Sequence, residues 1–590
     1  MKDNHYLINK SFQRYLVPSI LAILGGNISF MVDHIIAGRV LGSNALAAMS
    51  MVNPLFFLLT TIGTLICVGS STMASVSIGR ENKQTANELF TLSTVLVLMV
   101  GGLISIAGFI LLDPIVNLLS NGQELQAMVY DYCLGLIPGS ICIMAVYIPL
   151  NFFRIEGRGH LGMIMFLIMA VLNIALDLHF TVVMGMGMFG LALATVLSSL
   201  IAVMLMFPFL LFKGGGYRFV SIAKSLRLVN GIVIVGSPPA LNNFYSVIRT
   251  FILNTLILAV GGSVAVASFA FVNSVNTLAQ GVVSGISQTV SPLVGVFYGE
   301  HDVLSIKKVV KLAVKLGMAA MVIFSIFIAL LSRQICVVFG LTSAEQQSIA
   351  APALMICSIS LVGAMVNQIF IYYYMTIGRT KIANLITLGR GLLFIILTAY
   401  ILSRSLGIYG IWISFSVSEL LSFLIIAITV KQTLRKENEL SGVLLLNHCD
   451  VEEGRFISFS VGTKVEAVME SSDKISDFCE SCSLNPKQSM VISLAIEEIL
   501  LLMVKHVFEG NNNDSIDVKI FVRRDMITMR FRCGGRKFNP LEYYKAAMEK
   551  SNGFEDSDMD ESMGLRLISK IAKKVDYTTS LGLNNIVIRI

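Results

Sequence analysis

Long apolar runs separated by short polar segments fill the first three quarters of this 590-residue chain. Each run is long enough for a helix to cross the roughly 30 Å hydrocarbon core of a membrane. A segment in lipid must satisfy its own backbone hydrogen bonds, so we interpret each run as a helix. The pattern predicts an all-α polytopic membrane protein with twelve spans, near residues 14–37, 51–78, 90–112, 130–152, 161–184, 189–212, 231–259, 265–297, 309–331, 350–376, 382–403 and 409–430.

The two halves of the apolar region repeat one another. An ungapped shift of 220 residues places residues 42–79 on residues 262–299, which marks an internal repeat. Because six spans per half is an even number, both halves point the same way, as in parallel repeats related by an axis along the membrane normal. We therefore expect an N-lobe over residues 1–220 and a C-lobe over residues 221–431. The positions retained by the shift are Gly42, Ser43, Ala45, Ala47, Val52, Asn53, Gly79, Gly187 and Gly190, against Gly262, Ser263, Ala265, Ala267, Val272, Asn273, Gly299, Gly407 and Gly410.

The pattern changes after residue 431. The chain carries 23 basic and 13 acidic side chains before Thr433, against 21 and 24 in the much shorter remainder, a density typical of soluble domains. Residues 432–454 are predicted to be a polar linker. Over residues 455–590, alternating runs such as VKIFVRR and ITMRFRC predict strands, and MVISLAIEEILLLMVKHVFEG predicts an amphipathic helix. The order, ending in helix, strand, turn and strand, predicts an α+β domain.

Basic side chains are distributed unevenly among the loops. The N-terminal segment and the even-numbered loops hold most of the Lys and Arg residues, among them Arg80, Arg154 and Arg158, and the odd loops hold few. By the positive-inside rule, both termini are predicted to be cytoplasmic in a multi-pass plasma-membrane protein. The net charge of +7 then reflects membrane topology, and we expect no nucleic-acid partner.

Acidic residues within the spans are costly in hydrocarbon and persist mainly in cavities or pairs. Asp33 lies in span one, Asp177 in span five and Glu419 in span twelve. Asn173 shares a helical face with Asp177, since the two are four residues apart. Two carboxylates and an amide from one half could provide hard oxygen ligands for sodium, or a proton site. The alternative is that Asp33 and Asp177 cap helix ends near the membrane surface.

The phrases VDHIIAGR, LNIALD and GMFGLALATVLS, in order within a twelve-span repeat, resemble the multidrug and toxic compound extrusion (MATE) transporters. The resemblance covers roughly residues 10–431. In the DinF-like branch of that family it implies an N-lobe cation site, with Asp33, Asn173, Asp177 and Thr195 here, and Asn151 as a weaker addition. Spans seven and ten lack the carboxylates that another branch places there.

The C-lobe interior contains polar side chains of a different kind. As a substrate wall they would be hydrated, with Arg249 or Arg390 paired to Glu419 or meeting an anionic group. As structural groups they would only join helices by hydrogen bonds. The candidates are Asn242, Asn243, Arg249, Asn273, Asn276, Gln280, Asn367, Gln368, Arg390 and Glu419.

The last 136 residues resemble the anti-sigma-factor serine kinases of the histidine-kinase-like ATPase superfamily. LAIEEILLLMVKH and GLRLISKIAKKVDYTTSLGLNNIVIRI carry the likeness. It implies a nucleotide site that is degenerate here. Glu498 is followed by Leu502 where the family has a magnesium-holding asparagine, although His506 is kept. Cys533 replaces the adenine-reading aspartate, ahead of Gly535, and Gly564 remains from a second glycine motif. We expect a domain kept for binding a protein, without ATPase or kinase activity; a working ATP site is the alternative.

Together these features predict a non-enzymatic, sodium- or proton-coupled antiporter. It would export small cationic or amphiphilic compounds by alternating access, with no other cofactor and no metal centre, and with a cytoplasmic regulatory protein as a partner for the tail. Two alternatives stay open. One is a transporter-derived sensor that signals through the tail, and the other is a lipid or precursor flippase.

Overall fold

The computed structural model describes residues 6–120, 125–212, 216–222, 225–338, 344–447, 455–482, 484–508, 514–523, 526–540, 542–543 and 572–590. The chain forms two compact units. One is the membrane unit, Arg14–Lys436. The other, here called the tail unit, combines Met1–Gln13 with Glu437–Ile590.

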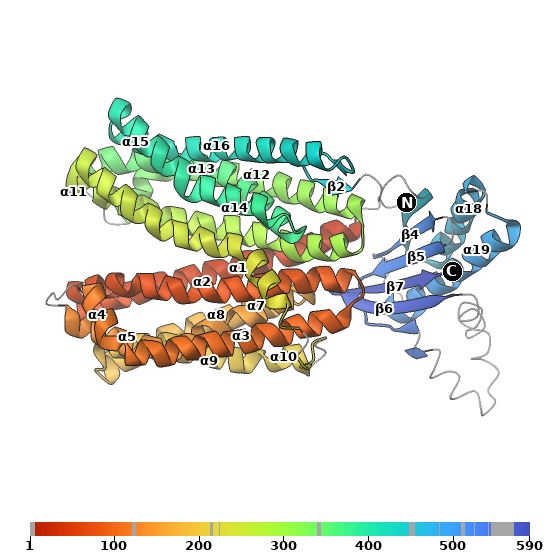
Figure 1. The fold of residues 1–590 in the computed structure, drawn as a ribbon, viewed down its shortest axis with the longest axis horizontal. Helices are drawn as coiled ribbons and strands as arrows, with labels where there is room; N and C mark the ends of the chain where they lie inside the picture. Colours follow the sequence, from red (N-terminus) through yellow and green to blue (C-terminus); the bar gives the residue numbers. More distant parts are fainter. Residues whose placement is uncertain are drawn as a thin grey trace. The chain divides into compact units, whose positions relative to one another are not determined.

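Twelve helical spans, as predicted, are present among the described residues. In the N-lobe the helices are α1 (Tyr6–Ile36), η1 (Ala37–Leu41), α2 (Ser43–Gly79), α3 (Lys83–Ile110), α4 (Leu112–Ser120), α5 (Gln126–Leu136), η2 (Ile137–Gly139), α6 (Ser140–Ala145), α7 (Tyr147–Ile155), α8 (Gly159–Leu178), η3 (His179–Val183), α9 (Gly187–Met206) and α10 (Pro208–Leu211). In the C-lobe they are α11 (Leu228–Gly299), α12 (Val303–Val338), α13 (Ala344–Thr376), α14 (Thr380–Leu388), η4 (Gly389–Leu393), α15 (Phe394–Leu406) and α16 (Ile408–Lys436). Figure 1 shows the two sets of helices as separate bundles of the membrane unit.

Repeat-related glycines take the same unusual backbone conformation in both lobes. Gly42, between η1 and α2, has φ 92°, and Gly262, at the break within α11, has φ 68°. Gly187 and Gly407 have φ 58° and 59° at the starts of α9 and α16. A side chain strains the backbone in this left-handed region, so these turns favour glycine. The repeat read from the sequence is therefore a repeat of turn geometry.

The lobes are in close backbone contact where α2 and α11 end. A Cβ added to Gly79 would lie 2.1 Å from the Val296 carbonyl oxygen, and one added to Gly299 would lie 2.2 Å from the Val76 carbonyl oxygen. The two contacts are related by the 220-residue shift. Small residues let helix backbones approach this closely in membranes. The lobes are thus in contact at this end of the membrane unit.

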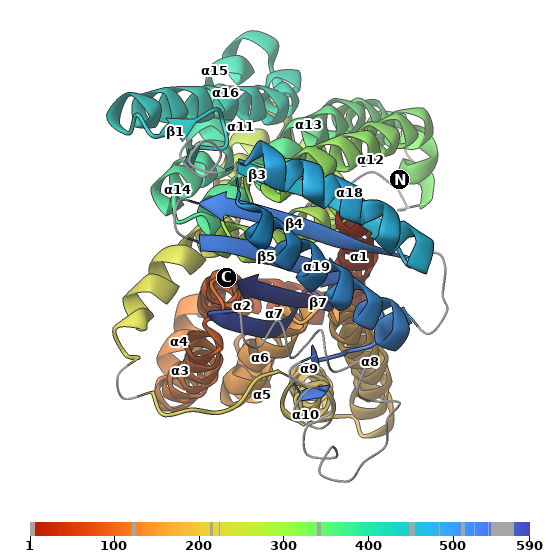
Figure 2. The same ribbon diagram turned by 90° about the vertical axis from the view of Figure 1, so that its right-hand side faces the viewer.

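The tail unit contains a five-stranded antiparallel sheet in the order β3-β4-β5-β7-β6. Its elements are β3 (Arg455–Gly462), α18 (Val465–Ser481), α19 (Pro486–Phe508), β4 (Ser515–Arg523), β5 (Met526–Cys533), β6 (Lys574–Ser580) and β7 (Leu583–Arg589). Figure 2 shows α18 and α19 over one face of the sheet, where apolar side chains of the helices and strands form a single core. A two-stranded sheet, β1 (Leu440–Ser441) with β2 (Leu446–Asn447), precedes it. The helix expected before the last two strands lies outside the described residues.

Candidate functional site

Asp33 and Asp177, from different helices of the N-lobe, come together in the structure. Asp33 lies near the end of α1 and Asp177 near the end of α8, and each is followed within a turn by a π-helical segment, η1 or η3. Such segments are frequent at functional sites. Asp33 is 6% exposed and Asp177 is fully buried. The two carboxyl groups interact with each other electrostatically. The two carboxyl groups thus lie in one buried site of the N-lobe.

Few donors serve this carboxyl pair. Ser29 Oγ donates to Asn173 Oδ1 at 2.7 Å, which fixes the amide beside the pair. Both carboxylate oxygens of Asp177, Asp33 Oδ1 and Asn173 Nδ2 are buried without a hydrogen-bond partner among the described residues. Two neighbouring carboxylates that are buried without hydrogen-bond donors cannot both stay ionised unless a cation lies between them. The arrangement can hold one proton or one small hard cation on its oxygens.

The two remaining residues of the expected cation site are placed differently. Thr195 Oγ1 donates to the Leu191 carbonyl of its own helix at 3.2 Å. Asn151 Nδ2 donates to the Tyr147 carbonyl at 2.8 Å, and the side chain lines a separate cavity between the lobes. The structure brings Asp33, Asp177 and Asn173 together, and among the described residues no hydrogen bond joins Thr195 or Asn151 to them.

A second buried charged group lies in the C-lobe. Arg390, in the π-helical segment η4, donates from Nη2 to Glu419 Oε1 at 2.8 Å and from Nε to both carboxylate oxygens at 3.1 Å. Asn367 Nδ2 donates to Glu419 Oε2 at 2.7 Å, and Gln368 Oε1 accepts from Arg390 Nη1. Of the two predicted arginines, Arg390 is therefore the partner of Glu419. Its charge is matched by a carboxylate of opposite sign.

Within the described part of the chain, no hydrogen bond links the other C-lobe candidates to this network. Arg249 Nη2 donates to Ser246 Oγ at 3.3 Å, one turn away on α11. The amide side chains on α11 are half-buried, namely Asn242, Asn243, Asn273, Asn276 and Gln280.

Arg154 was predicted to lie in a basic loop, and this is wrong. It belongs to the last turn of α7 and is 4% exposed. Its Nη1 donates to Oε1 of Gln288, on α11 of the other lobe, at 2.5 Å. The apolar run predicted that the fourth span ends before residue 154. Hydropathy cannot recognise a buried arginine whose hydrogen-bond partner lies in the other lobe.

In the tail unit, the residues that depart from the kinase pattern are packed into the core. Leu502, on α19, is 4% exposed and belongs to the core formed by this helix and the sheet. Cys533 is fully buried at the end of β5. Burial raises the pKa of the Cys533 thiol, so it is a neutral group. Asn584 Nδ2 lies 3.8 Å from its sulfur. Burial, with the neighbouring Glu497 charge, also raises the pKa of Glu498.

Other side chains of the tail unit contact His506 and Gly535, two positions of the nucleotide site that the resemblance implies. The His506 ring stacks on Phe538 with a centroid distance of 4.9 Å and an interplanar angle of 9°, and it also contacts Tyr543. Burial lowers the pKa of His506. Gly535 has φ 87°, and its added Cβ would lie 2.8 Å from Val507 Cγ1, so this loop is held against the end of α19. Gly564 lies outside the described residues.

The membrane unit is similar to known proteins. The MatE family model matches residues 18–179 and 238–401, just over half of the chain. The chain belongs to the MatE family. Members of this family are secondary transporters and not enzymes, which confirms the predicted class of protein.

Curated relatives of this MatE chain include the "Probable multidrug resistance protein YoeA" of Bacillus subtilis (strain 168). It is 23% identical over 358 residues, which cover 59% of this chain and 76% of that protein. The multidrug export protein MepA of Staphylococcus saprophyticus is 22% identical over 417 residues, covering 70% of this chain and 90% of MepA.

A solved structure described as the outward-facing conformation of a multidrug resistance MATE family transporter of the MOP superfamily has a TM-score of 0.68 to this chain. It is 23% identical and covers 74% of this chain and 98% of its own. At that identity the likeness shows the fold alone. A multi-pass membrane protein with twelve helices is the fold that the apolar runs predicted.

Proposed function

We propose that this MatE chain is a cation-coupled multidrug exporter of the DinF-like branch that works by alternating access between its two lobes. Sodium or a proton is the coupling ion, and the exported molecules are small cationic or amphiphilic organic compounds. The names of the two relatives, a multidrug resistance protein and a multidrug export protein, support efflux.

The observation that carries the proposal is the carboxyl pair of Asp33 and Asp177. Their buried oxygens have no hydrogen-bond partner among the described residues, so a bound cation or proton stabilises the pair strongly. Ion binding and substrate release are coupled when the two states of the lobes differ in affinity for that ion. The pair joins α1 to α8, so its occupancy can bias how these helices pack.

The protein is proposed to lie in the plasma membrane with both termini on the cytoplasmic side. The basic loops support that orientation. The end at which Gly79 meets Val296 is then the cytoplasmic end, and the lobes are in contact there. Export requires that this contact opens and closes in each cycle.

The tail unit is proposed to be a nucleotide-free, histidine-kinase-like domain that recognises a cytoplasmic regulatory protein or this transporter's own loops. Two buried residues support this role. Leu502 has no polar atom that could bind magnesium, and the neutral Cys533 thiol cannot accept a charge-assisted hydrogen bond from adenine as an aspartate would.

A flux assay tests the transport proposal. The purified chain is reconstituted in vesicles, and efflux of a fluorescent organic cation is followed with a sodium gradient, with a proton gradient and with neither. We expect one ion gradient to drive accumulation and the absence of both to abolish it. Ligand binding without gradient-driven flux would favour a sensor, and flux of labelled lipid alone would favour a flippase.

A chain that ends at Lys436, the boundary of the membrane unit, tests the tail. We expect its efflux rate, or the response of that rate to cytoplasmic extract, to differ from that of the full chain at equal amounts of protein. Unchanged rates and unchanged response would leave the tail without a role in transport.

A further inference from the structure

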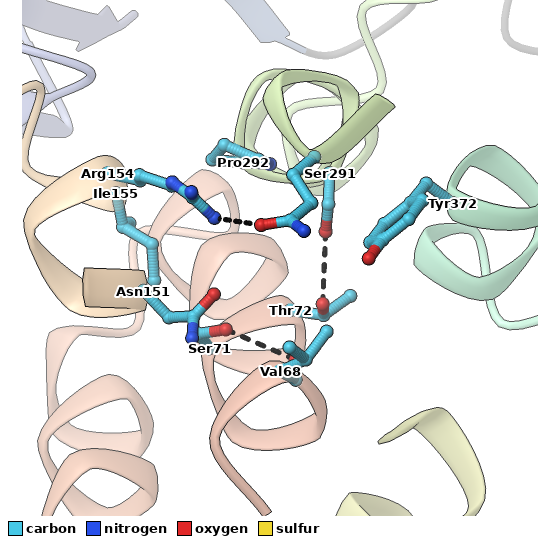
Figure 3. Close-up of a pocket in the computed structure, with 10 residues that line it drawn as sticks. Val68, Ser71, Thr72, Asn151, Arg154, Ile155, Ser291, Pro292 and Tyr372 are labelled. Carbon is cyan, nitrogen blue, oxygen red and sulfur yellow. Dashed lines mark hydrogen bonds between the residues drawn. The ribbon is translucent and has the colours of Figure 1, made fainter. Parts of the chain in front are cut away.

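A small cavity lies between the lobes, away from the carboxyl pair. The N-lobe contributes Val68, Ser71 and Thr72 from α2 and Asn151, Arg154 and Ile155 from α7, and the C-lobe contributes Gln288, Ser291 and Pro292 from α11 and Tyr372 from α13. Figure 3 shows Asn151 and Arg154 on one side of it and Ser291 and Tyr372 on the other. The cavity has room for about one water-sized particle. It is therefore too small for an organic substrate.

The lining of this cavity carries a positive charge without a matching negative one among the described residues. Among the ten described residues that line it, Arg154 is the only charged one and none is acidic. Arg154 is 4% exposed, and its Nη1 is occupied by Gln288. Its Nη2 is buried without a hydrogen-bond partner among the described residues. A neutral amide accepts one hydrogen bond from the guanidinium but leaves its positive charge uncompensated, which is costly away from water.

The remaining polar groups can complete a shell around an anion. Thr72 Oγ1 and Ser291 Oγ lie 3.0 Å apart across the lobe boundary, so only one of the two hydroxyl protons is used in that contact. The Tyr372 hydroxyl also lines the cavity. The guanidinium N–H groups and the hydroxyl O–H groups can donate hydrogen bonds to an anion. Charge-assisted hydrogen bonds are about twice as strong as those between neutral groups.

We propose that this cavity binds a single compact inorganic anion of the size of chloride, held by Nη2 of Arg154. The small volume of the cavity favours a compact ion over a bulky organic anion, and the unmatched positive charge favours an anion over water. This site is separate from the cation site of the proposed function.

The site exists only while the two lobes are together at this end, because both lobes contribute to the lining. A ligand that binds one state better than another shifts the equilibrium toward that state. The bound anion therefore stabilises the arrangement in which α2 and α11 are in contact.

The test uses the purified full chain and does not depend on transport. Thermal unfolding is measured in sodium chloride, sodium bromide and sodium gluconate at one sodium concentration and one ionic strength. Chloride and bromide should raise the unfolding temperature in a saturable way, and the bulky gluconate should not. A crystal grown in bromide should show the anomalous peak beside Arg154 Nη2.

Three variants locate the effect. Arg154→Gln should weaken the apparent chloride affinity at least tenfold. Arg158→Gln is the matched control, because Arg158 lies four residues on and donates to the Phe209 carbonyl within the N-lobe; it should keep the chloride response. Gln288→Glu supplies an internal counter-ion of the same shape next to Arg154. It should remove the chloride response while leaving the protein at least as stable in gluconate, so it remains informative if Arg154→Gln does not fold.

Several outcomes would overturn the proposal. They are an equal response to chloride and gluconate in the unaltered chain, an undiminished chloride response in Arg154→Gln or Gln288→Glu, and a bromide peak elsewhere with none at Arg154. In each of these cases water alone would account for the cavity, and the cation-coupled transport proposed above would be unaffected.

Discussion

The two lobes contain buried charged groups of opposite design. In the N-lobe, Asp33 and Asp177 are of the same charge type, and three of their four carboxylate oxygens are buried without donors among the described residues. In the C-lobe, Arg390 and Glu419 carry opposite charges, and side-chain amides add further hydrogen bonds. The first pair requires an external cation or proton, and the second is satisfied without one. Burial of a charge therefore does not mark a functional site; the charge and hydrogen-bonding capacity left over after folding do.

The largest effect is expected from the N-lobe. Asp177→Asn keeps the shape of the side chain but cannot carry its charge. Gradient-driven efflux should fall by at least the roughly 10- to 100-fold that loss of a supporting group costs at metal sites. The vesicle assay measures this at matched protein content. Asp33→Asn should behave alike, and the double variant should lose little more, because both groups act on one ion.

The exposed Asp131 of the same lobe provides the control for that substitution. Asp131→Asn should leave efflux unchanged. Full gradient-driven efflux from Asp177→Asn would remove this carboxyl pair from the mechanism and with it the contrast between the lobes.

Substitutions in the C-lobe pair, Arg390 and Glu419, should change the stability of the protein and not the coupling of efflux to the ion gradient. Arg390→Met leaves Glu419 as an uncompensated buried charge, which costs about 3 to 5 kcal/mol in other proteins. The combined change Arg390→Met with Glu419→Leu should recover most of that loss. Thermal unfolding of the purified variants measures both. If the double variant folds but loses the dependence of efflux on the ion gradient, the C-lobe pair takes part in coupling and the comparison fails.

The glycine contacts should behave the same in both lobes, unlike the charged pairs. Gly79→Ala and Gly299→Ala each place a Cβ about 2 Å from a carbonyl oxygen of the other lobe, so the helices must separate at this end. We expect both to reduce efflux several-fold with insertion intact. Gly25→Ala is a control, since nothing lies within 4 Å of its added Cβ. Unequal effects of Gly79→Ala and Gly299→Ala would show that the lobe contact is not functionally symmetric.

The smallest effect is expected in the tail, where hydrogen bonds of Asn584 order the loop after β5. Asn584 accepts from the Phe538 backbone N–H at 3.2 Å and donates to the Arg536 carbonyl at 2.9 Å, which holds the loop after β5 in place. Calorimetry of the full chain with ATP and magnesium should detect no binding. Losing even one charge-assisted contact costs on the order of 1.5 to 3 kcal/mol. Micromolar affinity would contradict this prediction.

Much of the architecture follows from local pattern. Span length depends on membrane thickness, and the repeat is visible because equivalent turns need glycine at equivalent places, as at Gly42 and Gly262. Asp33 and Asp177 were recognisable because a carboxylate in an apolar run is rare. These features depend on single residues and their neighbours along the chain, so the sequence alone determined them.

What only the tertiary structure decided is the pairing of groups that lie far apart in sequence. Composition could not show that Glu419 is matched by Arg390 rather than Arg249, since either arginine has the right charge. Nor could it show that Arg154 is buried against Gln288, 134 residues away, because the desolvation of that guanidinium depends on a helix of the other lobe. Residual charge is a sum over neighbours in space, and only the packing of the lobes supplies those neighbours.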